Sequence, residues 1–205
     1  MSAPELLSRF GGFDDSVHGA PTSPEAIELI ERPACLVQVT SRKGKEVALA
    51  AAIKEQLGLE LPVPNYSISQ ASYAAYWLQP NCWLIEAPPE AGAVLVSRLA
   101  NALAGIAAVV DQSHGRCILR LSGSQARAVL ARCCRLDFHP RVFSVGRTVT
   151  TLVAHVSCTV RLVDEAPTFD LIVGSTFAIW LLEELLEASA AFGCRFIRAN
   201  QGQPT

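Results

Sequence analysis

Two apolar spacings alternate along this chain, one typical of strands and one typical of helices. Apolar residues recur at helical spacing from Lys45 to Leu57, and Gly58 follows where a helix would end. Strands and a second helix are predicted around it, at Cys35–Val39, Tyr73–Leu78, Cys82–Glu86 and about Glu90–Ala104. The first half therefore reads strand, helix, two strands and helix.

The second half repeats this order. Its predicted strands and helices are Cys117–Leu121, Ser124 to about Cys134, Thr148–Val156, Cys158–Leu162, Phe169–Val173 and Ser175–Phe192. Cys35 and Cys117 begin equivalent strands, and Trp83 and Asp170 lie in equivalent later strands. Two βαββα halves predict an α+β fold made of two ferredoxin-like, split βαβ halves related by an internal pseudo-repeat.

These halves set the predicted domain organisation. It comprises an N-terminal arm at 1–30, a first half at 31–109, a second half at 110–194 and a C-terminal tail at 195–205, in one compact folding unit. Glycines and prolines interrupt any period in the arm, where only a short helix from Pro24 to Ile30, capped by Ser23, is predicted. Such arms are frayed or lie on a partner.

Composition favours a chain with a partner. Hydrophobic residues make up 50% of the 205 residues and charged residues only 18%, below the usual quarter. Between Leu61 and Asp111 the charged residues are Glu86, Glu90, Arg98 and Asp111 itself, while Trp77 and Trp83 lie in the same stretch. Aromatic side chains with little charge are typical of protein interfaces, although a well-packed domain rich in Ala and Leu fits the same composition.

Several function classes are disfavoured. A net charge of -2 without a basic tract argues against nucleic acid binding. The longest apolar run, Leu99 to Val110, is too short to span a bilayer, and the N-terminus lacks a signal core. The seven cysteines form no C-x-x-C pair, which predicts free thiols in a reducing cytoplasm rather than a zinc site.

The residues with catalytic side chains have structural explanations. Asp111 and Ser113 precede His114 at a strand end, where we expect them to bind backbone groups rather than form a triad. Cys133 and Cys134 end a helix, whose dipole there disfavours a thiolate. The turns Ser122–Ser124 and Gly174–Thr176 supply hydroxyls that we expect to cap helices rather than bind phosphate.

His139-Pro140-Arg141 is the more specific motif, because Pro140 restricts the backbone of His139. Arg141 with His139 could bind an anion or carboxylate. The interpretation we favour is contact with local groups or with a partner.

The run DQSHGRCILRLSGSQARAVLARCCRLDFHPRVFSVG, then LVAH and PTFDLIVGSTFAIWLLEELLEASAAFG, resembles the gamma subunit family of heterotetrameric sarcosine oxidase. The resemblance covers roughly Trp77 to Gly193. It implies a fold related to the folate-binding halves of aminomethyltransferases and a non-catalytic role in a cytoplasmic complex. That complex demethylates an N-methyl amino acid oxidatively and passes the one-carbon unit to tetrahydrofolate.

The resemblance also implies partners. The chain would dock on a large alpha subunit, with beta and delta subunits in the same complex, and FAD, FMN, NAD and zinc would belong to those partners. No catalytic, cofactor or metal residue is assigned to this chain; the candidate interface residues are Trp77, Trp83, His139 and Arg141. The alternatives are a gamma-type subunit of N-methylglutamate dehydrogenase, a stand-alone folate-binding aminomethyltransferase-like protein and an unrelated metabolite-binding module.

Overall fold

The computed structural model describes residue 10, residues 16–18 and residues 27–199. Within these residues the chain divides into two compact units. Residues 34–116 form the first unit, and the second combines the described residues before 34 with residues 117–199. The domain prediction placed the boundary between the halves at 109 and 110, whereas the contacts divide the chain after Arg116.

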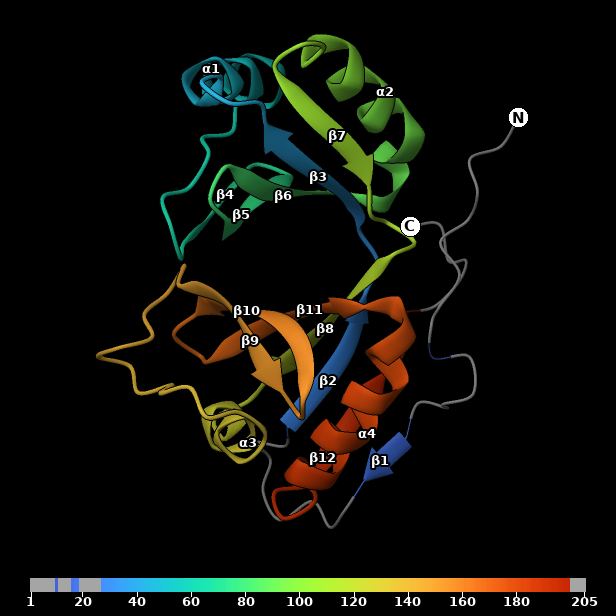
Figure 1. Cartoon of the computed structure of the whole chain (residues 1–205). Coiled ribbons are helices and arrows are strands. Elements are labelled where there is room, and N and C mark those ends of the chain that lie inside the picture. Colours follow the sequence, from blue (N-terminus) through green and yellow to red (C-terminus); the bar gives the residue numbers. More distant parts are fainter. Residues whose placement is uncertain (1–9, 11–15, 19–26, 200–205) are drawn as a thin grey trace. The chain divides into compact units, whose positions relative to one another are not determined.

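The first unit is a five-stranded antiparallel sheet with two helices on one face (Figure 1). The strand order is β4-β5-β6-β3-β7. Alternate residues of β3 and helix residues such as Leu49 and Leu99 form its core. The elements are β3 (Cys35–Ser41), α1 (Glu46–Leu57), β4 (Ser67–Gln70), β5 (Tyr73–Gln79), β6 (Cys82–Ala87), α2 (Gly92–Ala102) and β7 (Ala107–Asp111).

The second unit is a seven-stranded sheet in the order β1-β12-β2-β8-β11-β10-β9. Two helices, α3 and α4, cover one face (Figure 1), and Leu130 and Leu185 belong to the core beneath them. The elements are β1 (Ser16–His18), β2 (Ile27–Arg32), β8 (Arg116–Ser122), α3 (Ala126–Cys133), β9 (Thr148–Val153), β10 (Val156–Asp164), β11 (Thr168–Gly174), α4 (Ala178–Ser189) and β12 (Cys194–Ile197).

The predicted pseudo-repeat is present in the topology. In the first unit β3 lies between β6 and β7. In the second unit β8 takes the place of β3, and it lies beside β11 as β3 lies beside β6. Each unit thus has the split βαβ order, so the α+β prediction is confirmed. The second unit departs in two respects: β2 is inserted between β8 and β12, antiparallel to β8 and parallel to β12, and β1 is added antiparallel to the outer edge of β12.

The predicted N-terminal arm and C-terminal tail differ from the structure. Residues 27–30 belong to strand β2, not to a helix, and residues 195–197 belong to β12. Buried and half-buried residues alternate along β2, as a strand requires, and its neighbours on both sides supply the pairing. Ser23 and Pro24, the predicted start of the helix, lie outside the described residues.

Helix ends follow the sequence in part. Gly58 ends α1 in the left-handed conformation with φ 64°, as predicted. The prediction that hydroxyl groups cap α3 and α4 is wrong. These helices begin after Gln125 and Phe177, and neither residue makes a side-chain capping bond. Strand β4, which the sequence did not predict, pairs antiparallel with β5. In the described part of the chain, no helix is long and apolar enough to cross a membrane.

Candidate functional site

Trp77 and Trp83 lie directly opposite each other on β5 and β6 of the first unit. The indole Nε1 of Trp83 donates a hydrogen bond to the backbone carbonyl of Pro62 at 3.1 Å, and the ring packs against the core of the first unit. Both side chains are half-buried. The pair therefore stabilises the sheet and also leaves aromatic surface exposed.

The HPR corner follows α3 in the second unit. The backbone N–H of Arg141 donates to Nδ1 of His139 at 3.2 Å, and the N–H of His139 donates to the carboxylate of Asp137 at 2.8 Å. The His139 carbonyl accepts bonds from the next two N–H groups, of Val142 and Phe143. Both His139 and Arg141 are exposed. His139 and Arg141 belong to the second unit, and the two tryptophans belong to the first.

Asp111 and Ser113 bind backbone groups, as predicted. The Asp111 carboxylate accepts a bond from the N–H of Ser113 at 2.9 Å, and the Ser113 hydroxyl accepts one from the N–H of Leu36 at 3.0 Å. The second bond attaches the turn after β7 to the neighbouring strand β3. Both oxygens thus have a structural role at the edge of the sheet.

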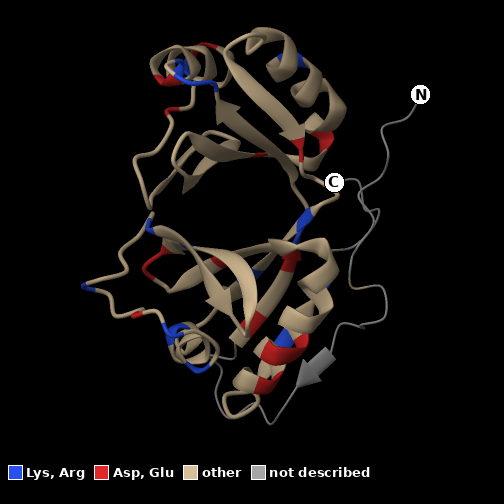
Figure 2. Ribbon diagram, viewed as in Figure 1, with Lys and Arg blue, Asp and Glu red and all other residues tan. Residues whose placement is uncertain are grey.

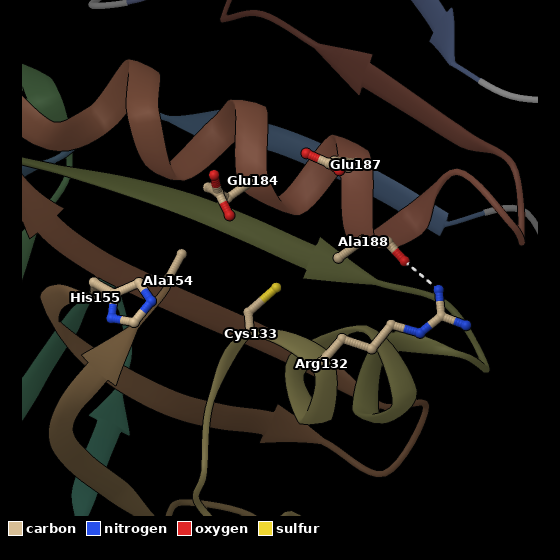
Figure 3. Close-up of a pocket in the computed structure, with 7 residues that line it drawn as sticks. All are labelled: Arg132, Cys133, Ala154, His155, Glu184, Glu187 and Ala188. Atoms are coloured by element: carbon tan, nitrogen blue, oxygen red, sulfur yellow. Dashed lines mark hydrogen bonds between the residues drawn. The ribbon is translucent and has the colours of Figure 1, made fainter.

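A surface pocket of about 420 Å³ opens between α3, α4 and the β9–β10 hairpin (Figure 3). The Arg132 guanidinium donates to the Ala188 carbonyl at 2.7 Å and lies 4.6 Å from the centroid of the Phe192 ring. Two acidic side chains of α4, Glu184 and Glu187, also line the pocket. The complete lining is Arg132, Cys133, Ala154, His155, Glu184, Glu187 and Ala188.

The Cys133 thiol in this pocket is kept protonated. Burial raises the pKa of Cys133 to about 11, and the carboxylate of Glu184 contributes in the same direction. A protonated thiol is a poor nucleophile and metal ligand, which agrees with the prediction for a helix C-terminus. Among the described residues, no group of three or more His, Cys, Asp or Glu could hold a metal ion.

The hairpin at the pocket's edge has a fixed tip. Ala154 and His155 both have left-handed backbones, with φ of 48° and 67°. The Ala154 N–H donates to the Cys133 carbonyl at 2.8 Å, and its carbonyl accepts a bond from Nε1 of Trp180 at 3.2 Å. The end of α3 and the first turn of α4 therefore both hold this tip.

The outer face of α4 and the residue before the helix expose large apolar side chains. The exposed fractions of Phe177 and Trp180 are 54% and 50%. The opposite face of the helix buries Ala178 and four leucines against the sheet. Acidic residues gather along α4 and basic residues on α3 (Figure 2).

A buried ion-pair cluster in the second unit was not predicted. The Asp170 side chain is fully buried on β11 and accepts bonds from Arg120 on β8 at 2.8 and 2.9 Å. Arg32 of β2 adds a third bond at 3.2 Å. The signal available in the sequence was the aspartate inside the apolar run FDLIV, because a buried charge needs a partner.

Comparison with known proteins identifies the family. A family model described as "Sarcosine oxidase, gamma subunit family" matches residues 42–191. The chain belongs to the sarcosine oxidase gamma subunit family. A gamma subunit of this family from Corynebacterium sp. (strain U-96) is 32% identical over 149 residues, which are 70% of each protein. One from Arthrobacter sp is 38% identical over 109 residues, 52% of this chain and 53% of that protein. The match thus spans about half the length of the Arthrobacter relative.

Solved structures agree with this family. A chain of the heterotetrameric sarcosine oxidase from Corynebacterium sp. U-96, in complex with pyrrole 2-carboxylate, aligns with a TM-score of 0.74 and 28% identity, covering 85% of this chain and 88% of that one. Glycine cleavage system aminomethyltransferase T from Bartonella henselae aligns with a TM-score of 0.61 and 17% identity, covering 84% and 48%. The second likeness concerns the fold alone, and it confirms the predicted aminomethyltransferase-like fold.

Proposed function

We propose that this chain is a gamma subunit, without a catalytic site of its own, in a heterotetrameric flavoenzyme of the sarcosine oxidase type. The complex demethylates an N-methyl amino acid oxidatively and passes the one-carbon unit to tetrahydrofolate. The observation that carries the proposal is the likeness to a chain of heterotetrameric sarcosine oxidase over 85% of the present chain.

The local structure supports an accessory role. Asp111 and Ser113 bind backbone N–H groups, His139 accepts a bond from the Arg141 backbone, and Cys133 is a protonated thiol. Each of these candidate catalytic groups therefore has a structural explanation. In the proposal the chain docks on a large alpha subunit, beta and delta subunits complete the complex, and these partners hold FAD, FMN, NAD and zinc.

The proposed interface of this subunit includes Trp77, Trp83, His139 and Arg141. Their exposed or half-buried surfaces support this assignment, because Trp and Arg are frequent in the centres of interfaces. The seven free cysteines support a cytoplasmic complex, since thiols stay reduced there.

Purification of the native complex through a tag on this chain tests the proposal. We expect a large flavoprotein to co-purify, with flavin absorbance and with turnover of sarcosine or N-methylglutamate. The isolated chain should have neither absorbance nor turnover. Turnover by the isolated chain, or purification without any flavoprotein, would contradict the proposal. Tight tetrahydrofolate binding by the isolated chain would favour the stand-alone folate protein instead.

A further inference from the structure

The exposed side of α4 combines aromatic and acidic residues in one stripe. Trp180, Glu184 and Glu187 follow one another at intervals of three or four residues, so they share one face of α4, and Phe177 lies three residues before Trp180, immediately before the helix. The opposite face of the helix is in the core. Phe177 and Trp180 thus present half-exposed rings at the N-terminal end of the helix, and the two carboxylates follow them along the same side. We call these four residues the α4 stripe.

The α4 stripe is preorganised. The bond from Trp180 Nε1 to the Ala154 carbonyl fixes the indole against the hairpin tip, and the Cys133 carbonyl fixes that tip from its other side. The Trp180 ring therefore has little freedom to lose when a ligand binds. Preorganised aromatic surface of this kind favours affinity because less side-chain entropy is lost on binding.

The pocket beside the α4 stripe is lined by one basic side chain, Arg132, and by two acidic side chains, Glu184 and Glu187. Arg132 is engaged with the Ala188 carbonyl and the Phe192 ring. Among the residues that the structure describes, the carboxylates of Glu184 and Glu187 form no hydrogen bond or ion pair. Both line the pocket of about 420 Å³ beside the stripe (Figure 3). The pocket therefore offers space and negative charge in the same place.

We propose that the α4 stripe and its pocket are a docking site for a segment of a partner subunit that carries an arginine beside an apolar side chain. The guanidinium reaches Glu184 and Glu187, its stem lies on the Trp180 ring, and the apolar side chain covers Phe177. Charge complementarity carries this choice of occupant, because a guanidinium matches carboxylates by paired hydrogen bonds and stacks on aromatic rings. The proposal rests on the function proposed above and names a surface of this subunit that meets its partner.

An anionic membrane is a poor occupant, because the carboxylates would repel it. A second copy of this chain placed by a two-fold axis is also poor, because the same acidic residues would then face each other. The remaining occupant is a basic segment of a different chain in the complex.

The test measures binding of the full-length chain to the immobilised remainder of the complex. We expect the double substitution Glu184→Arg and Glu187→Arg to weaken binding by at least about tenfold, as removal of a buried interfacial charge pair does. A matched control reverses two exposed carboxylates elsewhere, Glu55→Arg and Glu165→Arg, and should bind as the unchanged chain does. Trp180→Phe, which keeps the apolar surface and removes the hairpin bond, should weaken binding less than the double substitution.

The outcomes separate this inference from the proposed function. If the unchanged chain joins the flavoprotein and the double variant binds equally well, with an unchanged unfolding midpoint, the docking site is wrong and the function stands. If the unchanged chain joins no flavoprotein, the proposed function fails. Concentration-dependent self-association of the isolated chain, lost in the double variant, would show that a second copy is the occupant and would overturn the proposal.

Discussion

Arg120 binds both carboxylate oxygens of Asp170, through Nε at 2.8 Å and Nη2 at 2.9 Å. The two side chains come from strands β8 and β11, and the carboxylate is fully buried while the guanidinium is part-exposed. Paired bonds of this kind have a fixed geometry that a lysine cannot reproduce. The pair connects β8 and β11, which are neighbouring strands of the sheet in the second unit.

Asp170→Ala should therefore destabilise the protein strongly. It would leave Arg120 and Arg32 without their buried counter-charge, and loss of one partner of a buried ion pair costs about 3–5 kcal/mol of unfolding free energy. Urea denaturation of the full chain measures this loss. Arg120→Lys should cost less, because one bond to the carboxylate is kept. A change below about 1 kcal/mol for Asp170→Ala would mean that the cluster contributes little.

The raised pKa of Cys133 predicts slow alkylation in the native protein. Labelling by iodoacetamide should be weak at pH 7.5 and rise with an apparent pKa of about 11, because the thiolate is the reactive form. Peptide mass spectrometry against pH gives this profile. Glu184→Gln should lower the apparent pKa, and burial should still keep it above the ordinary value.

The same pKa shift has a consequence for stability. The thiol of the folded state holds its proton more strongly than the thiol of the unfolded chain. Its stabilising contribution is therefore complete below about pH 9 and is lost as the pH rises toward 11. Cys133→Ser should reduce the fall in the unfolding midpoint over this pH interval. An equal fall in both proteins would contradict the assignment.

Arg141→Glu tests the proposed interface at the HPR corner. The side chain is exposed and its backbone N–H makes the bond to His139, so the substitution should leave the unfolding midpoint unchanged. Assembly with the partner subunits should fall, as judged by co-purification. Arg42→Glu, at another exposed arginine, is the matched control, and equal assembly of both variants would remove Arg141 from the interface.

Gly58 and His155 have nearly the same left-handed backbone, with φ of 64° and 67°. A Cβ added to Gly58 would meet no atom within 4 Å, so Gly58→Ala should cost about 1 kcal/mol from the backbone conformation alone. His155→Gly should have the opposite sign and stabilise by up to about 1 kcal/mol. Thermal unfolding of both variants measures the two effects, and a loss of stability in His155→Gly would indicate that its side chain has a further contact.

Local signals in the sequence predicted most of the fold. Helix α1 followed from its apolar spacing and Gly58, and the order of elements in the two halves followed from alternating periods. Strand β2 was not predictable in this way. Its apolar residues Ile27 and Ile30 also fit one helical turn, and it is a strand because β8 and β12, far away in the sequence, pair with it.

The candidate site was less predictable for a related reason. The period of α4 indicated a buried face, but the half-exposed position of Trp180 depends on a carbonyl in the β9–β10 hairpin. The partners of Asp170 likewise come from separate strands. Pairings between distant segments are set by tertiary structure, which local periodicity does not encode.

The inserted strand β2 has a consequence for biosynthesis. On the ribosome β2 emerges before the whole of the first unit, whereas its parallel neighbour β12 emerges after all the other described strands. The first unit can therefore fold during translation, while the unpaired edge of β2 waits for strands that are not yet made. The exposed edge of β2 in the nascent chain is therefore where pairing with another chain, and so aggregation, is expected.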